Sequence, residues 1–158
     1  MKNITLLFML ISGLAFGQFT VKETSNDWKL IGKHYNNISF FKKDGKAKLV
    51  YLDYNTANEK ININIPTVDY TFEFSTDAET LDKLYTIIKE HFDNNKVETL
   101  TLQFAEGKMY LEFYKSLISY NFAFLFDADA NVTDKNSSFK RRTYPLKMND
   151  VNRLFGKK

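Results

Sequence analysis

Cysteine is absent from this chain of 158 residues, and its absence excludes several kinds of protein. Without cysteine there can be no disulfide framework, no thiol nucleophile and no cysteine-ligated zinc site. A bacterial lipid anchor is not expected either, because its lipid is attached to a cysteine. Exported eukaryotic domains of this size often carry disulfides, so we interpret the chain as a bacterial protein that packing alone stabilises.

Proline, glycine and histidine are scarce. The chain holds 2 prolines, 6 glycines and 2 histidines, too few for an extended loop architecture. It has no Gly-rich phosphate loop, no nucleotide-binding fingerprint and no short histidine spacing, and no Gly-x-Ser-x-Gly elbow marks a nucleophile. We therefore expect no cofactor and no metal site, and the pattern favours a protein that is not an enzyme.

An excess of one charge sign is missing as well. The chain has 22 basic and 19 acidic residues, which give a formal net charge of +3. Nucleic-acid binders rely on a concentrated positive field, so we expect no nucleic-acid partner. Aromatic residues, in contrast, are abundant at 16%, with 15 Phe and 9 Tyr. In a β-rich chain this content predicts a core built largely from aromatic rings.

The first 17 residues have the pattern of a signal peptide. Lys2 supplies a positive start, residues 4–11 are apolar except for one threonine, and Ala15-Phe16-Gly17 offers small residues at a cleavage site. The apolar run is shorter than the roughly 20 residues of a transmembrane helix, so we expect no transmembrane anchor. We predict cleavage after Gly17 and export to the periplasm or outside the cell, with residues 18–158 forming one globular domain.

The first half of this domain shows the alternation of β-strands. Asp44-Gly45 is a favoured two-residue turn, and pairing outward from it sets Phe40 opposite Leu49. The apolar residues of both strands then share one face. Residues 60–65 and 70–74 alternate in the same way and predict two further strands.

Near residue 76 the apolar period changes from 2 to 3.6, as in a helix. Thr76 and Glu79 have capping-box spacing, which predicts that the helix begins there. The apolar stripe of this helix, which we expect to face a sheet, consists of Leu81, Leu84, Tyr85, Ile88 and Phe92. A second, short helix is predicted near the C-terminal end, with an N-cap at Asn149 and a stop at Gly156.

The segment between the two helices predicts a three-stranded antiparallel meander. With a turn at residues 105–108, Leu102 faces Leu111, and with a turn at Lys115-Ser116, Leu111 faces Tyr120. The order of elements is therefore strands, helix, strands, helix. We predict an α+β fold in which an antiparallel sheet of hairpins and a meander packs against a mid-chain helix and a short C-terminal helix.

Two groups of polar residues are candidates for a binding surface. Tyr110, Glu112 and Tyr114 alternate with the apolar residues of the meander, so they share its other face. Tyrosines offer apolar area together with a hydroxyl group, which suits recognition. Lys140 and Arg142 share one face of an expected edge strand, where they either contact an anionic partner or protect the edge from aggregation.

The carboxylates leave further possibilities open. Glu73 and Glu112 both lie in the middle of predicted strands, and a pair of carboxylates is the chemistry of glycoside hydrolysis. Asp127, Asp129 and Asn131 have the spacing that begins a calcium loop, although the rest of that pattern is missing. Both a weak calcium site and a solvated loop fit these three residues.

Together these patterns favour an exported bacterial binding or accessory domain that is not an enzyme. Its partner would be another protein, a glycan or a small ligand. Two alternatives stay open, namely a carrier that holds a small apolar ligand in a β-lined cavity and a hydrolase whose site is assembled from scattered carboxylates.

Overall fold

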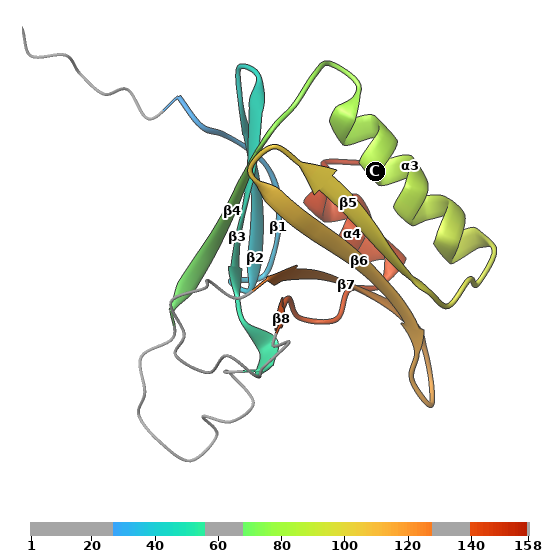
Figure 1. The fold of residues 1–158 in the computed structure, drawn as a ribbon. Helices are drawn as coiled ribbons and strands as arrows, with labels where there is room; N and C mark the ends of the chain where they lie inside the picture. The colour runs from blue at the N-terminus through green and yellow to red at the C-terminus, as the bar shows by residue number, and fades with distance from the viewer. Residues whose placement is uncertain (1–26, 56–67, 128–139, 158) are drawn as a thin grey trace, which may run out of the picture.

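The computed structural model describes residues 27–55, 68–127 and 140–157. Figure 1 draws the rest of the chain as a thin grey trace. The predicted signal segment, the predicted strand at residues 60–65 and all of the predicted calcium loop except Asp127 lie outside the described residues.

The described residues form two four-stranded antiparallel sheets and two helices (Figure 1). Sheet A has the strand order β1-β2-β3-β4 and sheet B the order β5-β6-β7-β8. The strands of sheet A are β1 (Lys29–His34), β2 (Ile38–Lys43), β3 (Lys46–Leu52) and β4 (Asp69–Ser75). The strands of sheet B are β5 (Thr99–Phe104), β6 (Gly107–Lys115), β7 (Tyr120–Asp127) and β8 (Lys140–Arg142). The helices are α3 (Thr80–Asp93) and α4 (Met148–Leu154), which confirms the predicted α+β fold with one mid-chain and one short C-terminal helix.

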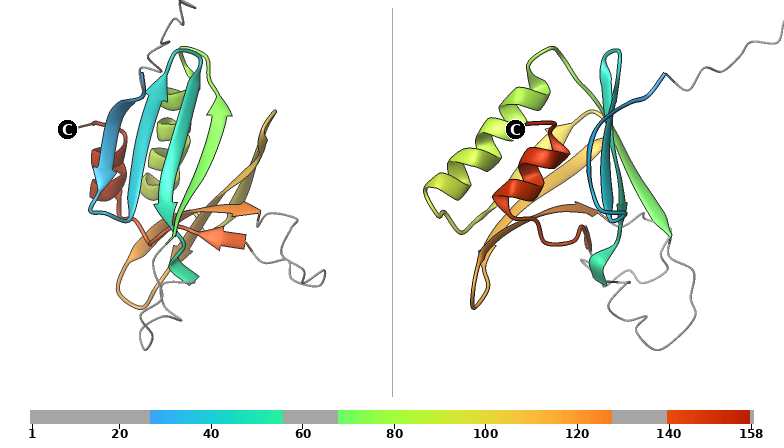
Figure 2. Two further views of the ribbon diagram at one scale, coloured as in Figure 1. Left: turned by 90° about the vertical axis from the view of Figure 1, so that its left-hand side faces the viewer. Right: turned by 180° about the vertical axis from the view of Figure 1, so that it is seen from behind.

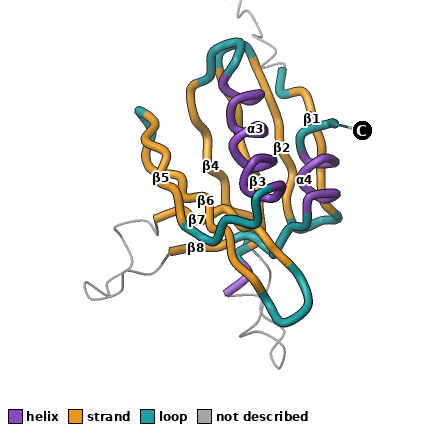
Figure 3. The backbone as a smooth tube through the Cα atoms, turned by 90° about the vertical axis from the view of Figure 1, so that its right-hand side faces the viewer, coloured by secondary structure: helices purple, strands orange, loops and turns teal. Residues whose placement is uncertain are grey.

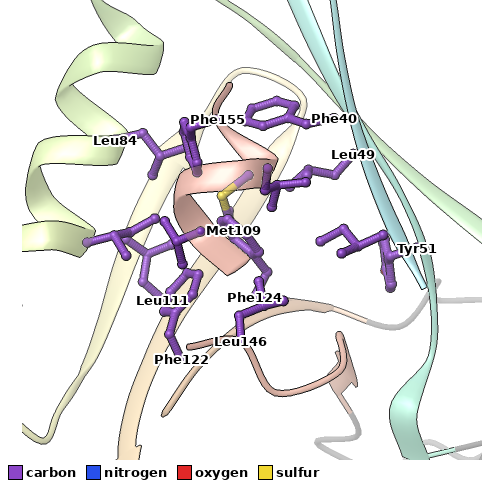
Figure 4. Packing of buried hydrophobic residues seen from close by; sticks show 14 of the residues in the cluster. Phe40, Leu49, Tyr51, Leu84, Met109, Leu111, Phe122, Phe124, Leu146 and Phe155 are labelled. Carbon is purple, nitrogen blue, oxygen red and sulfur yellow. The ribbon is translucent and has the colours of Figure 1, made fainter. Parts of the chain in front are cut away.

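Both helices lie on the same side of sheet A, and sheet B runs across at an angle to it (Figure 2). The apolar faces of the two sheets meet the helices in one core, seen from close by in Figure 4. Phe40 and Leu49 enter it from sheet A, Leu111 and Phe124 from sheet B, and Leu84 from α3, each at most 3% exposed. Because an apolar face must be covered, this packing places the opposite face of sheet B away from the core.

Aromatic rings join the two sheets, as the composition predicts. The ring of Phe126 in β7 lies 4.7 Å from that of Tyr51 in β3 and 4.8 Å from that of Phe72 in β4, measured between centroids. Phe104 in β5 likewise lies 4.6 Å from Phe74 in β4. Such pairs contribute about 0.5–1.5 kcal/mol each beyond the area that they bury.

The hairpin of β2 and β3 has the predicted register. Phe40 lies opposite Leu49, as expected from the Asp44-Gly45 turn. Gly45 has a φ of 67°, a left-handed conformation that glycine adopts without the steric cost of a Cβ atom. A turn whose sequence determines its length therefore determines the register of both strands.

In the meander the predicted faces are correct, but the predicted register is wrong. Leu102 faces Met109 rather than Leu111, because the β5–β6 turn has two residues and Phe104 pairs with Gly107. Leu111 in turn faces Phe124 rather than Tyr120. Both errors move the pairing by an even number of residues, so every side chain stays on its predicted face.

The second error arises at the β6–β7 turn, which is longer than predicted. Its four residues, 116–119, are held by a bond from the backbone N–H of Ser116 to the carbonyl oxygen of Ser119 at 2.8 Å. The side-chain amide of Asn121 also donates to the hydroxyl oxygen of Ser116 and the carbonyl oxygen of Ser119, both at 3.1 Å. The turn thereby presents Leu117 and Ile118 fully to solvent, at 104% and 94% exposure.

Helix α3 begins at Thr80, four residues after the predicted start. The carboxylate of Asp77, rather than the predicted Thr76–Glu79 pair, satisfies the first backbone N–H groups: it accepts from Glu79 at 2.9 Å and from Thr80 at 2.6 Å. The hydroxyl of Thr80 also donates to this carboxylate, and these hydrogen bonds lower the pKa of Asp77. Downstream, Leu84 and Ile88 are buried as predicted.

Helix α4 starts at Met148, with Lys147 instead of the predicted Asn149 as N-cap, because the Asp150 carboxylate accepts from the backbone N–H of Lys147 at 3.0 Å. Its apolar side packs against β1 at Gly32, where an added Cβ atom would lie 1.9 Å from the carbonyl oxygen of Arg153. Gly156, with a φ of 65°, follows the helix as predicted. Its apolar side consists of Val151, Leu154 and Phe155, which are all buried.

Candidate functional site

Strand β6 presents the three predicted polar residues on the outer face of sheet B. Its burial alternates along the strand, so that Met109, Leu111 and Phe113 are buried while Tyr110, Glu112 and Tyr114 lie half-buried on the other side. This alternation is the consequence of an extended backbone with one face in the core.

Strand β8 adds the two predicted basic residues to the same face. Arg142 pairs with Leu125 and Lys140 with Asp127 of β7, and directly paired residues of an antiparallel sheet share a face. Arg141 points to the other side, where its guanidinium group lies 4.0 Å from the centroid of the Tyr70 ring. The structure therefore brings all five predicted site residues together, and we call them the outer-face cluster: Tyr110, Glu112, Tyr114, Lys140 and Arg142.

At one end of the outer-face cluster, Lys140 covers Tyr110. The Lys140 ammonium nitrogen lies 3.3 Å from the centroid of the Tyr110 ring, in cation–π geometry. The Tyr110 hydroxyl donates to Oδ2 of Asp127 at 3.3 Å. Partial desolvation of this surface hydroxyl, together with the bond to Asp127, raises the pKa of Tyr110. Tyr110 is therefore a neutral hydrogen-bond donor at physiological pH.

At the other end, Arg142 is enclosed by aromatic rings and a carboxylate. Its Nε donates to Oε2 of Glu112 at 2.8 Å. The guanidinium carbon lies 4.5 Å from the centroid of the Tyr114 ring and 5.6 Å from that of Tyr54. Burial raises the pKa of Tyr114 against the opposing effect of the Arg142 charge. With its side chain only 19% exposed, Arg142 is a fixed member of this face.

The end of β3 in sheet A supports this arrangement from the side. Asp53 is 3% exposed, and its Oδ1 accepts from the backbone N–H of Arg142 at 3.0 Å and from that of Asn55 at 3.3 Å. The side-chain amide of Asn55 donates to the carbonyl oxygen of Lys140 at 3.2 Å. These bonds join sheet A to β8 and so position both basic side chains of the outer-face cluster.

Sequence reasoning missed Asp53, Tyr54 and Asn55. Asp53 and Tyr54 stand at the end of the strand predicted after the Asp44-Gly45 turn, and Asn55 follows it. No local pattern marks them, because their partners lie more than 80 residues further along the chain.

The two carboxylates that suggested a hydrolase lie in different sheets. Glu73 in β4 forms an ion pair with Lys46 at 2.7 Å, and Glu112 in β6 forms one with Arg142 at 2.8 Å. Each charge is therefore neutralised by its own cation.

Three cavities that described residues line lie outside the outer-face cluster. One of about 720 Å³ lies beside the β2–β3 turn and the start of α3, and its lining includes Lys42, Lys43, Asp44 and Asp77. Its charged walls do not favour the apolar-ligand alternative. In the described part of the chain, no three His, Asp or Glu residues are grouped closely enough to hold a metal ion.

No helix among the described residues has the length and apolarity to cross a membrane. Comparison of the chain with protein-family models, with curated proteins and with solved structures gave no match.

Proposed function

We propose that this chain is an exported, non-enzymatic binding domain that recognises a partner protein through the outer face of sheet B. The observation that carries the proposal is the convergence of the outer-face cluster, in which two tyrosines, two basic residues and one carboxylate come from strands far apart in the sequence. Export rests on the signal-peptide pattern of residues 1–17.

The chemistry of the outer-face cluster suits a protein interface. Tyrosine and arginine are enriched among the residues that contribute most to binding, because they combine apolar area with directed hydrogen bonds. The ion pair of Arg142 with Glu112 already balances these two charges, so covering this end of the face does not leave either of them isolated. Small-molecule sites are concave, whereas these residues lie along the surface of a sheet, which favours a macromolecular partner.

Two parts of the outer-face cluster have different roles in this proposal. Arg142 and Glu112 hold β8 in place together with Asp53, so their substitution would disturb the fold as well as binding. Tyr110 and Tyr114 have aromatic area at the surface, and truncating them removes contact area without breaking a backbone hydrogen bond. The tyrosines are therefore the residues to substitute in a test of binding.

The test is chemical crosslinking in cells that produce the protein natively, with the crosslinked species quantified by mass spectrometry. In the double variant Tyr110→Ala, Tyr114→Ala we expect partner recovery to fall by about tenfold or more, the effect of losing two central interface residues. Tyr35→Asn is the matched control: Tyr35 is 71% exposed in the turn between β1 and β2, and asparagine tolerates its φ of 49°. Equal recovery from the double variant and the control would contradict the proposal.

If the double variant fails to fold, the single variant Tyr110→Ala decides the question. Tyr110 lies at the more open end of the outer-face cluster, and its hydroxyl bond to Asp127 is at the surface. A folded Tyr110→Ala protein that keeps its full partner recovery would place the binding surface elsewhere.

A further inference from the structure

Among the described residues, sheet B has one edge strand that lacks the usual protection against pairing with another strand. Three of the four edge strands carry charge: β1 has two lysines and a register shift, β4 has Asp69 and Glu73, and β8 consists of three basic residues. Charges and irregularities of this kind keep sheet edges from associating. Strand β5, with the sequence TLTLQF, has no charge, no proline and a regular register over six residues.

The backbone groups on the open edge of β5 can be identified from its pairing. The backbone N–H of Phe113 donates to the carbonyl oxygen of Glu98 at 2.9 Å, so hydrogen-bonded pairs with β6 fall on every second residue from Glu98 onward. The residues between them, Thr99, Thr101 and Gln103, point their N–H and C=O groups away from β6. All three are exposed, and Figure 3 shows β5 on the outside of sheet B.

We infer that a second copy of this chain pairs with β5 through its own β5, antiparallel and with Thr101 on the twofold axis. Outward-pointing groups must meet outward-pointing groups, and paired side chains must share a face. A register centred on Thr101 satisfies both conditions. It sets Thr101 opposite Thr101 of the second copy, Thr99 opposite Gln103, and Leu100 opposite Leu102.

The side chains of β5 are complementary to themselves in this register. The polar residues Thr99, Thr101 and Gln103 meet one another on the outer face, where threonine pairs are favourable. Leu100 and Leu102, half-buried in the single chain, cover each other on the core side. Strand β8 could not pair with itself in this way, because it would oppose six basic side chains across the axis.

The contact is small, so the association is weak and depends on protein concentration. Five paired residues in each copy bury less than the roughly 1,200 Å² at which stable interfaces begin. The pairing nevertheless gives sheet B and its copy one continuous eight-stranded sheet. Tyr110 is the β6 neighbour of Thr101, so two Tyr110 side chains would lie about 14 Å apart, three strand spacings, on one surface. The relevance of this spacing to partner binding rests on the proposed function, whereas the pairing of the two β5 strands does not.

The first test is sedimentation equilibrium of the full chain from micromolar concentration to about 1 mM, a range that covers weak association. We expect a monomer–dimer equilibrium in the wild type. Thr101→Pro removes the outward N–H of residue 101 without breaking the bonds of β5 to β6. Because both copies of a symmetric dimer lose this N–H, two intermolecular hydrogen bonds are lost, and the dissociation constant should rise roughly tenfold or more. Thr101→Lys sets two like charges face to face on the axis and should also weaken the dimer.

Thr71→Lys is the matched control, because Thr71 is an exposed threonine in the middle of β4, another edge strand. This variant should associate like the wild type. A wild type that stays monomeric throughout the concentration range would overturn the inference. So would a dimer whose dissociation constant is unchanged in a folded Thr101→Lys variant.

The second test uses the absence of cysteine from the natural chain. Cα atoms of a hydrogen-bonded antiparallel pair lie about 5.5 Å apart, within disulfide range. Mild oxidation of Thr101→Cys should therefore yield a covalent dimer, whereas Thr71→Cys should not. Thr99→Cys and Gln103→Cys should crosslink faster when mixed than either does alone. Equal crosslinking at positions 101 and 71 would contradict the inference.

Discussion

Replacing the buried carboxylate of Asp53 tests whether the end of sheet A holds the outer-face cluster in place. Asp53 is 3% exposed, and one of its oxygens accepts two backbone N–H groups, from Arg142 at 3.0 Å and from Asn55 at 3.3 Å. Asp53→Ala removes this acceptor oxygen, so the backbone N–H of Arg142 in β8 and the backbone N–H of Asn55 after β3 both lose this hydrogen bond. The bond to Arg142 matters more, because it is shorter and ties β8 to sheet A.

The expected loss of stability follows from these two bonds. A buried donor left without its acceptor costs about 1–3 kcal/mol, and the longer bond to Asn55 adds a smaller amount. We therefore expect Asp53→Ala to lower the free energy of unfolding by about 2–4 kcal/mol. Asp53→Asn keeps an acceptor oxygen in place and should cost about 1 kcal/mol.

Urea unfolding followed by circular dichroism measures this loss, with Asp69→Ala as control. Asp69 is an exposed aspartate at the start of β4, so its substitution should change stability by less than about 0.5 kcal/mol. Hydrogen exchange adds a local measurement, since the amide of Arg142 should exchange faster in Asp53→Ala. If Asp53→Ala is no less stable than Asp69→Ala, the reasoning about this junction is refuted.

Four further predictions test other parts of the structure. Leu84→Ala in α3 should lower the free energy of unfolding by about 2–5 kcal/mol because Leu84 is 3% exposed, and a loss below about 0.5 kcal/mol would place it at the surface. Leu117→Ser with Ile118→Ser should change that free energy by less than about 0.5 kcal/mol, since both residues are fully exposed at the β6–β7 turn. The lowered pKa of Asp77 means that its stabilising effect is present above the ordinary aspartate pKa of about 3.9 and is lost as the pH falls through the lower folded-state value. Urea titrations from neutral to acidic pH should therefore show a weaker acid dependence in Asp77→Asn. Peptide mapping of the mature protein should find Gln18 as the first residue, and intact Met1 in the mature pool would refute export by cleavage.

The amino-acid sequence predicts local features of this fold better than the pairing of distant segments. The Asp44-Gly45 turn determines its own length, and the register of β2 with β3 was correct. The turns after β5 and β6 have no such signature, so their lengths and the pairings of Leu111 were wrong although its face was right. Alternation shows which side chains share a face, but not which strands pair, and the division into two sheets was therefore not predictable.

The candidate site shows the same limit. The alternation of β6 identified Tyr110 and Tyr114 as outward residues, and the basic edge strand was recognised separately. That Lys140 would lie on Tyr110 depends on the pairing of β8 with β7, a long-range contact that no local pattern contains. The contribution of Asp53 depends on how the two sheets meet, which again is decided by tertiary packing.

The central claim is that the outer face of sheet B binds a partner protein. Photo-crosslinking from position 110 tests this claim most directly. A photoreactive phenylalanine derivative replaces Tyr110 in one variant and Tyr35, which is exposed in the turn between β1 and β2, in the other. Illumination of producing cells should attach a defined partner protein to position 110 and not to position 35. If position 110 captures nothing, or both positions capture the same proteins equally, the outer face of sheet B is not the binding surface.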